Sequence, residues 1–243
     1  MSASAIFVSI RNKATRLPGK SFLPLGGKPL VDQLVSRLKH ATRPSRIVIT
    51  TSAHADDAVF EEVAARTGVE CFRGSEDDKL DRYFEAMREY GIELAAIVDG
   101  DDPLCDPGYI DRLLEAVEAR QADFGTVGQL PVGVTANVIR QAAVGRVCEL
   151  KTEHDTEVWG GYFLQTGLFS TVTLEPDAAH RDPDLRLTLD YQEDYDVIRA
   201  VFDALGPTGE YFTLTEALAF IRSRPELRRL NLEAAARYEA NLK

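Results

Sequence analysis

The chain has 243 residues, of which 44% are hydrophobic and 28% are charged, and its formal net charge is −11 at pH 7. That length is enough to bury a full core, in a single α/β domain or in two small domains, and the acidic balance argues against a nucleic-acid-binding protein, which needs a broad basic face. No run of about 18 apolar residues occurs, so we expect no membrane span, and the N-terminus lacks a signal-peptide pattern. The three cysteines are isolated and odd in number, which argues against a disulfide framework and fits a reducing, cytoplasmic location.

Strands and helices alternate in the first half of the sequence. Short apolar runs predict strands, and apolar residues at helical spacing predict helices. The predicted strands span 5–10, 46–52, 69–75 and 94–99, and the predicted helices span 30–41, 55–68, 78–91 and 107–122. This alternation predicts an α/β fold with a mostly parallel sheet and helices on both faces.

The second half is less regular. The stretch 125–167 has short β-like pieces, several glycines and no clean helical period, so we expect a mixed β excursion there. The stretch 184–205 restores a strand, a turn and a helix, and 213–243 is predicted to form C-terminal helices with a break at Pro225. Because no repeat or low-complexity linker interrupts the chain, we expect a single domain over 1–243.

Positive charge gathers directly after the first predicted strand. The stretch SIRNKATRLPGKSFLPLGGKPL, residues 9–30, carries five Lys or Arg residues and no acid, although the whole chain is acidic. Its Pro and Gly residues break a helix, so part of the stretch is a loop. A basic loop at the carboxyl end of a strand is where α/β proteins bind anions.

Carboxylates follow two other predicted strands. Asp99, Asp101 and Asp102 come after the strand 94–99, and Asp190 ends the strand within 184–190. Because parallel strands bring their carboxyl ends to one edge of the sheet, we expect these acids to face the basic loop. Carboxylates that hold Mg²⁺ beside Lys and Arg side chains that clamp phosphate oxygens are typical of phosphate-transfer chemistry.

Plainer interpretations stay open at this point. Asp102 precedes Pro103 and reads as a turn residue, Asp190 reads as a cap of the next helix, and Arg11 or Lys20 alone reads as a surface charge. The sequence Asp-Gly-Asp at 99–101 also matches the D-x-D metal motif of glycosyltransferases. No P-loop, dinucleotide-binding or nucleophile-elbow motif occurs, which argues against the enzymes that use them.

Six motifs in a fixed order suggest a family. TRLPGK, LGGKPL, FRGSEDDKLDRY, GDDPLCDP, LRLTLDYQEDYDVIRA and YFTL closely resemble the cytidylyltransferases of the spore coat polysaccharide biosynthesis type. That group is similar to the enzymes that make CMP-activated keto-deoxy sugars and CMP-acylneuraminate. The resemblance covers about residues 5–125 and 184–231. It implies a Rossmann-like nucleotidyltransferase fold and Mg²⁺-dependent transfer of CMP from CTP to an acidic sugar or similar acid, with release of pyrophosphate.

The resemblance also implies roles for individual residues. It assigns phosphate contacts to Arg11, Arg16 and Lys20, and the metal to Asp101 and Asp190. Arg16, Lys20 and Asp101 would be the catalytic residues, with Asp101 also close to the nucleotide.

The rest of the chain follows the family pattern less closely. Arg73 and Ser75, in FRGSEDD, would lie close to the nucleotide, and Ala14 stands where a small polar residue is usual. The region 126–180 keeps little of the pattern beyond EHDT; the resemblance implies that it forms the acceptor side and, over 126–165, a dimer arm of a homodimer. A glycosyltransferase, a transferase that uses another nucleoside triphosphate and a non-catalytic nucleotide-binding protein are the alternatives.

Overall fold

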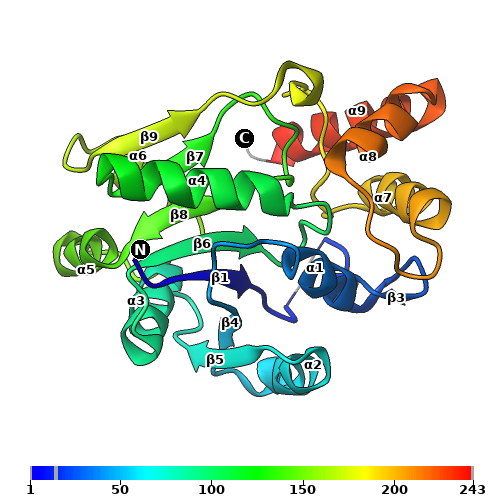
Figure 1. Cartoon of the computed structure of the whole chain (residues 1–243). Helices are drawn as coiled ribbons and strands as arrows, with labels where there is room; N and C mark the ends of the chain where they lie inside the picture. Colours follow the sequence, from blue (N-terminus) through cyan, green and yellow to red (C-terminus); the bar gives the residue numbers. More distant parts are fainter. Residues whose placement is uncertain (1, 14–15, 242–243) are drawn as a thin grey trace.

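The computed structural model describes residues 2–13 and 16–241. Its centre is a seven-stranded sheet with the order β5-β4-β1-β6-β8-β7-β9 (Figure 1). The strands of this sheet are β1 (Ser4–Ser9), β4 (Arg46–Ser52), β5 (Glu70–Gly74), β6 (Leu94–Asp99), β7 (Phe124–Val127), β8 (Asn137–Arg140) and β9 (Thr171–Leu174). A two-stranded ribbon of β2 (Pro24–Leu25) and β3 (Lys28–Pro29) lies in the basic stretch.

The sheet is parallel except at one strand. β1 pairs in parallel with β4 and β6, and β4 pairs in parallel with β5. β8 runs antiparallel to both β6 and β7, and β9 is parallel to β7. The predicted mostly parallel sheet with a mixed excursion is therefore confirmed.

Helices cover both faces of the sheet. The α-helices are α1 (Leu30–Leu38), α2 (Val59–Thr67), α3 (Lys79–Tyr90), α4 (Pro107–Arg120), α5 (Gln141–Leu150), α6 (Gly161–Leu164), α7 (Gln192–Leu205), α8 (Leu214–Arg222) and α9 (Pro225–Asn241), and the short 3-10 helices are η1 (Lys20–Phe22), η2 (Ala55–Ala58) and η3 (Ala178–His180). In the described part of the chain, every helix is too short or too polar to span a bilayer.

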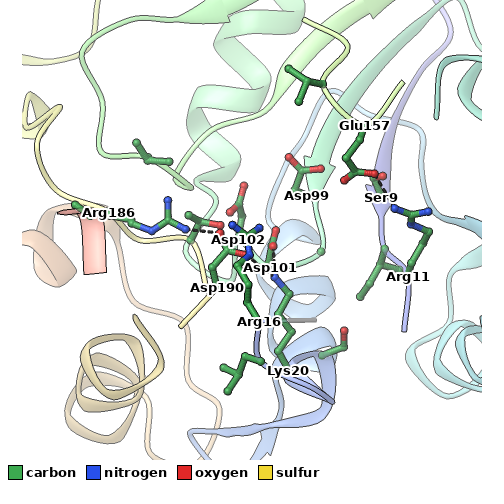
Figure 2. A pocket seen from close by; sticks show the side chains of 18 of the residues that line it. Ser9, Arg11, Arg16, Lys20, Asp99, Asp101, Asp102, Glu157, Arg186 and Asp190 are labelled. Carbon is green, nitrogen blue, oxygen red and sulfur yellow. Dashed lines mark hydrogen bonds and ion pairs between the residues drawn. The ribbon is translucent and has the colours of Figure 1, made fainter. Parts of the chain in front are cut away.

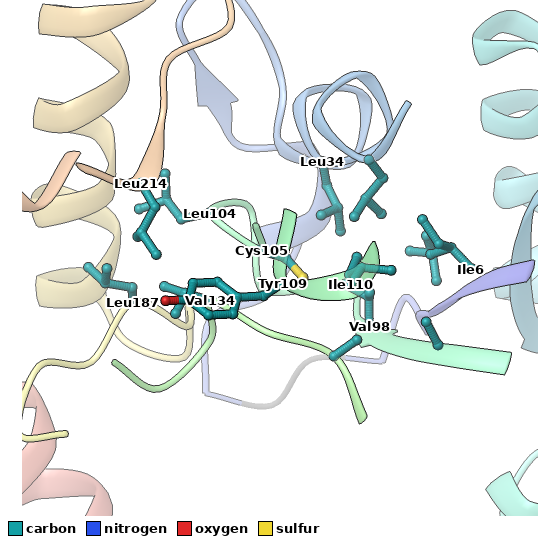
Figure 3. Close-up of a cluster of buried hydrophobic side chains, with 14 of the residues drawn as sticks. Ile6, Leu34, Val98, Leu104, Cys105, Tyr109, Ile110, Val134, Leu187 and Leu214 are labelled. Atoms are coloured by element: carbon teal, nitrogen blue, oxygen red, sulfur yellow. The ribbon is translucent and has the colours of Figure 1, made fainter. Parts of the chain in front are cut away.

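Alternating side chains of β1 divide the interior into two cores. Ile6 and Val8 point into a core shared with α1, α2, α4, α7 and α8, part of which is drawn in Figure 3. Ala5 and Phe7 point to the opposite face and pack with α3 and α5. Successive residues of a strand face opposite sides of a sheet, so a strand buried on both faces reads as the continuous apolar run found here.

Most predicted elements of the first half are confirmed, but the expectation of no helix in the excursion is wrong. α5 occupies residues 141–150 and buries Ala143, Val144 and Val147. Gly145 lies within this helix and interrupts its apolar spacing. A Cβ at this position would lie 2.8 Å from the ring of Phe84 on α3, which is too close for an ordinary contact. Gly145 therefore weakens the helical pattern of the sequence and permits the close approach of α5 to α3.

The predicted strand that ends at Asp190 is also wrong. Residues 184–190 are extended but pair with the neighbouring loop only through an isolated parallel bridge between Val132 and Arg186. The ladder stops because the next donor, the Leu189 N–H, bonds the carbonyl of Asp101 instead, at 2.9 Å. The predicted break at Pro225 is confirmed, because α8 ends before it and α9 begins with it.

Candidate active site

A cleft of about 1460 Å³ opens at the carboxyl ends of β1 and β6 (Figure 2). The residues assigned to phosphate and metal all line it: Arg11, Arg16, Lys20, Asp101 and Asp190. The basic loop therefore meets the acids that follow β6, and it also meets Asp190 at the end of the segment 184–190, as the sequence predicts. Ala14 and Thr15, which belong to the same loop, lie outside the described residues.

Lys20 is the centre of one end of the cleft. Its Nζ lies 2.5 Å from Asp101 Oδ2, 3.1 Å from Asp190 Oδ1 and 2.8 Å from the Leu189 carbonyl. Gly19, at φ 70°, makes the left-handed turn that leads into η1, which begins at Lys20. Burial acts to lower the pKa of Lys20, but the two carboxylates outweigh it and raise the pKa above its ordinary value. Lys20 is thus a fixed positive charge between two aspartates.

Asp190 is surrounded by cations. The residue is only 6% exposed. Its Oδ1 also forms an ion pair with Arg16 at 3.0 Å, and its Oδ2 forms one with Arg186. Burial acts to raise its pKa, but Lys20, Arg16 and Arg186 outweigh that effect and hold the pKa of Asp190 below its ordinary value. The Leu189–Asp101 hydrogen bond, and not a sheet ladder, brings this carboxylate to Asp101.

Of the acids at the end of β6, namely Asp99, Asp101 and Asp102, only Asp102 is buried. Asp102 lies in a turn, where its N–H bonds the Asp99 carbonyl at 3.1 Å, but its side chain is only 7% exposed. Gly133 packs against it, since a Cβ there would lie 2.9 Å from Asp102 Oδ1. Burial, with added repulsion from Asp101 and Asp99, raises the pKa of Asp102 well above its ordinary value. The interpretation of Asp102 as a turn residue is therefore incomplete, because its carboxyl is buried.

Asp101 and Asp190 fit a magnesium ion that is bound together with a nucleotide. Both contact one ammonium group, so the geometry already brings a positive charge to the two carboxylates. Among residues 2–13 and 16–241, no group of three or more His, Cys, Asp or Glu side chains is arranged to hold a metal ion. Mg²⁺ usually takes one or two carboxylates and completes its shell with phosphate oxygens and water, so this pair suffices.

The other end of the cleft depends on Glu157, which the sequence analysis missed. Glu157 pairs with Arg11 at 2.7 Å and with Lys79 at 2.9 Å, and Lys79 also lies 3.7 Å from Asp99. Burial acts to lower the pKa of Lys79, but the negative groups around it outweigh burial and raise the pKa above its ordinary value. Because a cation in the first turn of a helix opposes the helix dipole, Lys79 at the start of α3 was a signal of this site.

Arg186 is a second residue that the sequence analysis missed. In LRLTLD the leucines at 185, 187 and 189 are buried, and Arg186, Thr188 and Asp190 alternate with them. Arg186, Thr188 and Asp190 line the cleft. Alternation in an extended segment puts residues i, i+2 and i+4 on one face, so the sequence contained the signal.

Arg73 and Ser75 lie elsewhere. The Arg73 guanidinium donates to the carbonyls of residues 52–54, and the Ser75 hydroxyl accepts from the Asp78 N–H. Neither is among the described residues that line the cleft. Their assignment to the nucleotide stays a prediction that the geometry does not support.

The family follows from a sequence comparison. A family model described as Cytidylyltransferase matches residues 5–205, which is most of the chain. This chain belongs to the cytidylyltransferase family. The cytidylyltransferase is therefore a CTP-dependent nucleotidyltransferase, and the glycosyltransferase, the non-catalytic protein and the transferase for another nucleotide are set aside.

Known proteins resemble this cytidylyltransferase over nearly its full length. The spore coat polysaccharide biosynthesis protein SpsF of Bacillus subtilis (strain 168) is 27% identical over 233 residues, which is 93% of this chain and 97% of that protein. A solved cytidylyltransferase from Leptospira borgpetersenii serovar Hardjo-bovis has a TM-score of 0.83 at 24% identity, covering 93% of this chain and 97% of the other. CMP:2-keto-3-deoxy-manno-octonic acid synthetase, solved with CTP, has a TM-score of 0.66 at 15% identity, covering 84% of this chain and 99% of the other. These similarities confirm the predicted Rossmann-like nucleotidyltransferase fold.

Proposed function

We propose that this cytidylyltransferase transfers CMP from CTP to an acidic sugar or similar acid, with Mg²⁺ as cofactor, in the biosynthesis of a polysaccharide in the cytoplasm. The acceptor hydroxyl gives its proton to water as its oxygen bonds the α-phosphorus, and the bond from that phosphorus to the oxygen bridging the β-phosphate breaks. Pyrophosphate leaves. The observation that carries the proposal is the contact of Lys20 with both Asp101 and Asp190 in one cleft.

Each charged group has a role in this proposal. Arg11, Arg16 and Lys20 bind phosphate oxygens and neutralise the charge that grows on them during transfer. Asp101 and Asp190 would hold Mg²⁺, which would supply Lewis-acid stabilisation of the transferred phosphate. The Lys20 ammonium, which pairs with both aspartates, would also be within reach of a phosphate oxygen bound between them.

The acceptor assignment rests on similarity and on the cleft. The name of one structural neighbour joins CMP to an octonic acid, and the name of the relative from Bacillus subtilis places it in polysaccharide biosynthesis. The region 126–180 contributes Val132, Asp155, Glu157 and Val158 to the cleft, and α9 contributes a further wall with Leu232. A homodimer with 126–165 as its arm stays a prediction, which the molar mass in solution tests.

Product analysis tests the proposed function. The protein is incubated with Mg²⁺, each of the four nucleoside triphosphates and a panel of keto-deoxy sugar acids, acylneuraminates and neutral sugars. We expect pyrophosphate and a CMP-linked acid from CTP with an acidic acceptor. Pyrophosphate release with neutral sugars alone, or faster turnover of UTP than of CTP, would contradict the proposal.

A further inference from the structure

The Asp190 carboxylate is held on both of its oxygens. Its Oδ1 faces the cleft and contacts Lys20 and Arg16, whereas its Oδ2 contacts the guanidinium of Arg186 (Figure 2). Arg186 is only 6% exposed, so this contact is shielded from water. Because a carboxylate rotates about its last bond unless both oxygens are engaged, the contact with Arg186 fixes the plane of the carboxylate and keeps one oxygen directed toward Lys20 and Arg16.

A buried acid on α7 supports this contact. The Asp194 side chain is fully buried, and its Oδ1 lies 3.4 Å from Arg186 Nε. Its Oδ2 accepts hydrogen bonds from the N–H groups of Asp190 and Tyr191, each at 3.0 Å. Asp194 therefore forms an ion pair with the guanidinium of Arg186 and holds the backbone of Asp190 by two hydrogen bonds.

A buried amide on α9 holds the backbone of Arg186. The Arg186 N–H donates to Asn231 Oδ1 at 2.8 Å, and Asn231 Nδ2 donates to the Arg186 carbonyl. Asn231 is fully buried. The segment 184–190 has only an isolated bridge to Val132 in place of a strand ladder, so these two hydrogen bonds replace part of the missing pairing.

We infer that Arg186 and Asn231 are positioning residues that orient the Asp190 carboxylate toward the metal and the triphosphate. The inference rests on the proposed function, since it concerns the same aspartate. It makes α9 part of the active site, although this helix lies beyond residues 5–205, the region that the family model matches. Arg228, Leu232 and Ala235 of α9 line the same cleft, which places the helix at the site by a second route.

Metal affinity tests the inference without measuring turnover. Mn²⁺ is titrated against the protein and CTP and followed by its electron paramagnetic resonance signal. We expect Asn231→Ala to weaken Mn²⁺ binding by about 10-fold or more, as losses of partners that orient metal ligands do. Arg186→Met is expected to weaken it less, because this change also removes a positive charge beside Asp190. Arg186→Lys keeps a positive charge and is expected to retain part of the affinity.

Gln33→Ala is the matched control. Gln33 is also a buried amide that bonds two backbone groups, the carbonyls of Leu25 and Gly26, but it does not line the cleft among the described residues. We expect it to lower the melting temperature, as Asn231→Ala does, with Mn²⁺ affinity close to the wild-type value. Wild-type Mn²⁺ affinity in both Arg186→Met and Asn231→Ala would overturn the inference alone. No Mn²⁺ binding by the wild-type protein with CTP would overturn the inference together with the metal part of the proposed function.

Discussion

The two ends of the cleft hold their charges in different ways. At the first end, Lys20 bridges Asp101 and Asp190, and the side chains of Lys20 and Asp190 are 16% and 8% exposed. At the second end, Glu157 pairs with Arg11 (Figure 2). Glu157 also pairs with Lys79, and its side chain is 52% exposed. Both ends bring opposite charges together, but Asp190 at the first end is buried, whereas Glu157 at the second end is half-exposed.

This difference in burial predicts different roles for the two ends of the cleft. Charges in a buried network interact strongly and leave an uncompensated partner when one is removed, whereas exposed ion pairs are weak and exchange readily with water or ligand. We therefore expect substitutions at the first end to remove activity, and substitutions at the second end to adjust ligand affinity.

The largest effect is expected at the two aspartates of the first end. Asp101→Asn and Asp190→Asn keep the shape and remove the charge, so turnover is expected to fall at least about 10²-fold, as when one electrostatic stabiliser of a transition state is lost. Pyrophosphate release with CTP, Mg²⁺ and an accepted acid measures it. Asp102→Asn is the matched control and is expected to be much milder, because its carboxyl is buried with a raised pKa. Equal losses in all three variants would contradict the assignment.

The cations of the first end come next. Arg16→Ala and Lys20→Ala are each expected to lower kcat/KM for CTP by about 10-fold or more, since a hydrogen bond to a charged group is worth about 1.5–3 kcal/mol. Lys28 belongs to the same basic stretch but does not line the cleft in the described part of the chain. Lys28→Ala should therefore retain wild-type kinetics, and wild-type kinetics in Arg16→Ala and Lys20→Ala as well would show that this end does not bind the triphosphate.

The burial of Asp102 predicts a pH dependence of stability. Because the folded state raises its pKa, the stability that the protonated carboxyl contributes is complete below the unfolded pKa of about 3.9 and is lost as pH rises through the folded pKa. Asp102→Asn cannot titrate, so relative to the wild type it should become more stable as pH rises above about 4. Urea unfolding of both proteins measures this, and parallel stability curves would contradict the buried, raised carboxyl.

The smallest effect is expected at the second end. Glu157→Gln removes the charge that now holds Arg11 and Lys79, which frees Arg11 for a phosphate. We expect KM for CTP to fall by at most about fivefold, because half-exposed ion pairs are worth about 0.2–1 kcal/mol, with kcat nearly unchanged. Steady-state kinetics checks this split, and a collapse of kcat would place Glu157 in the chemistry of the first end.

The sequence predicted the first end better than the second, because most residues of the first end lie in short motifs at the ends of predicted strands. The acid-free basic loop and the aspartates after β6 follow regular strands, and parallel strands bring such residues to one edge. The second end needs the loop that carries Glu157 to cross to the start of α3. Thr156 of EHDT holds this loop there by hydrogen bonds to Asp78 and Leu80, which are contacts between distant segments that the motif alone does not reveal. The predicted strand before Asp190 shows a related limit, because a bridge to Val132 and the clamp by Asn231 depend on contacts between distant segments.

A crystal structure with CTP and Mg²⁺ tests the central claim most directly. The account predicts the ion between Asp101 and Asp190 on the α-phosphate, with Lys20 moved from the aspartates to a phosphate oxygen and Oδ2 of Asp190 still on Arg186. An ion on Asp99 and Asp102, or a triphosphate bound away from Arg16 and Lys20, would contradict it.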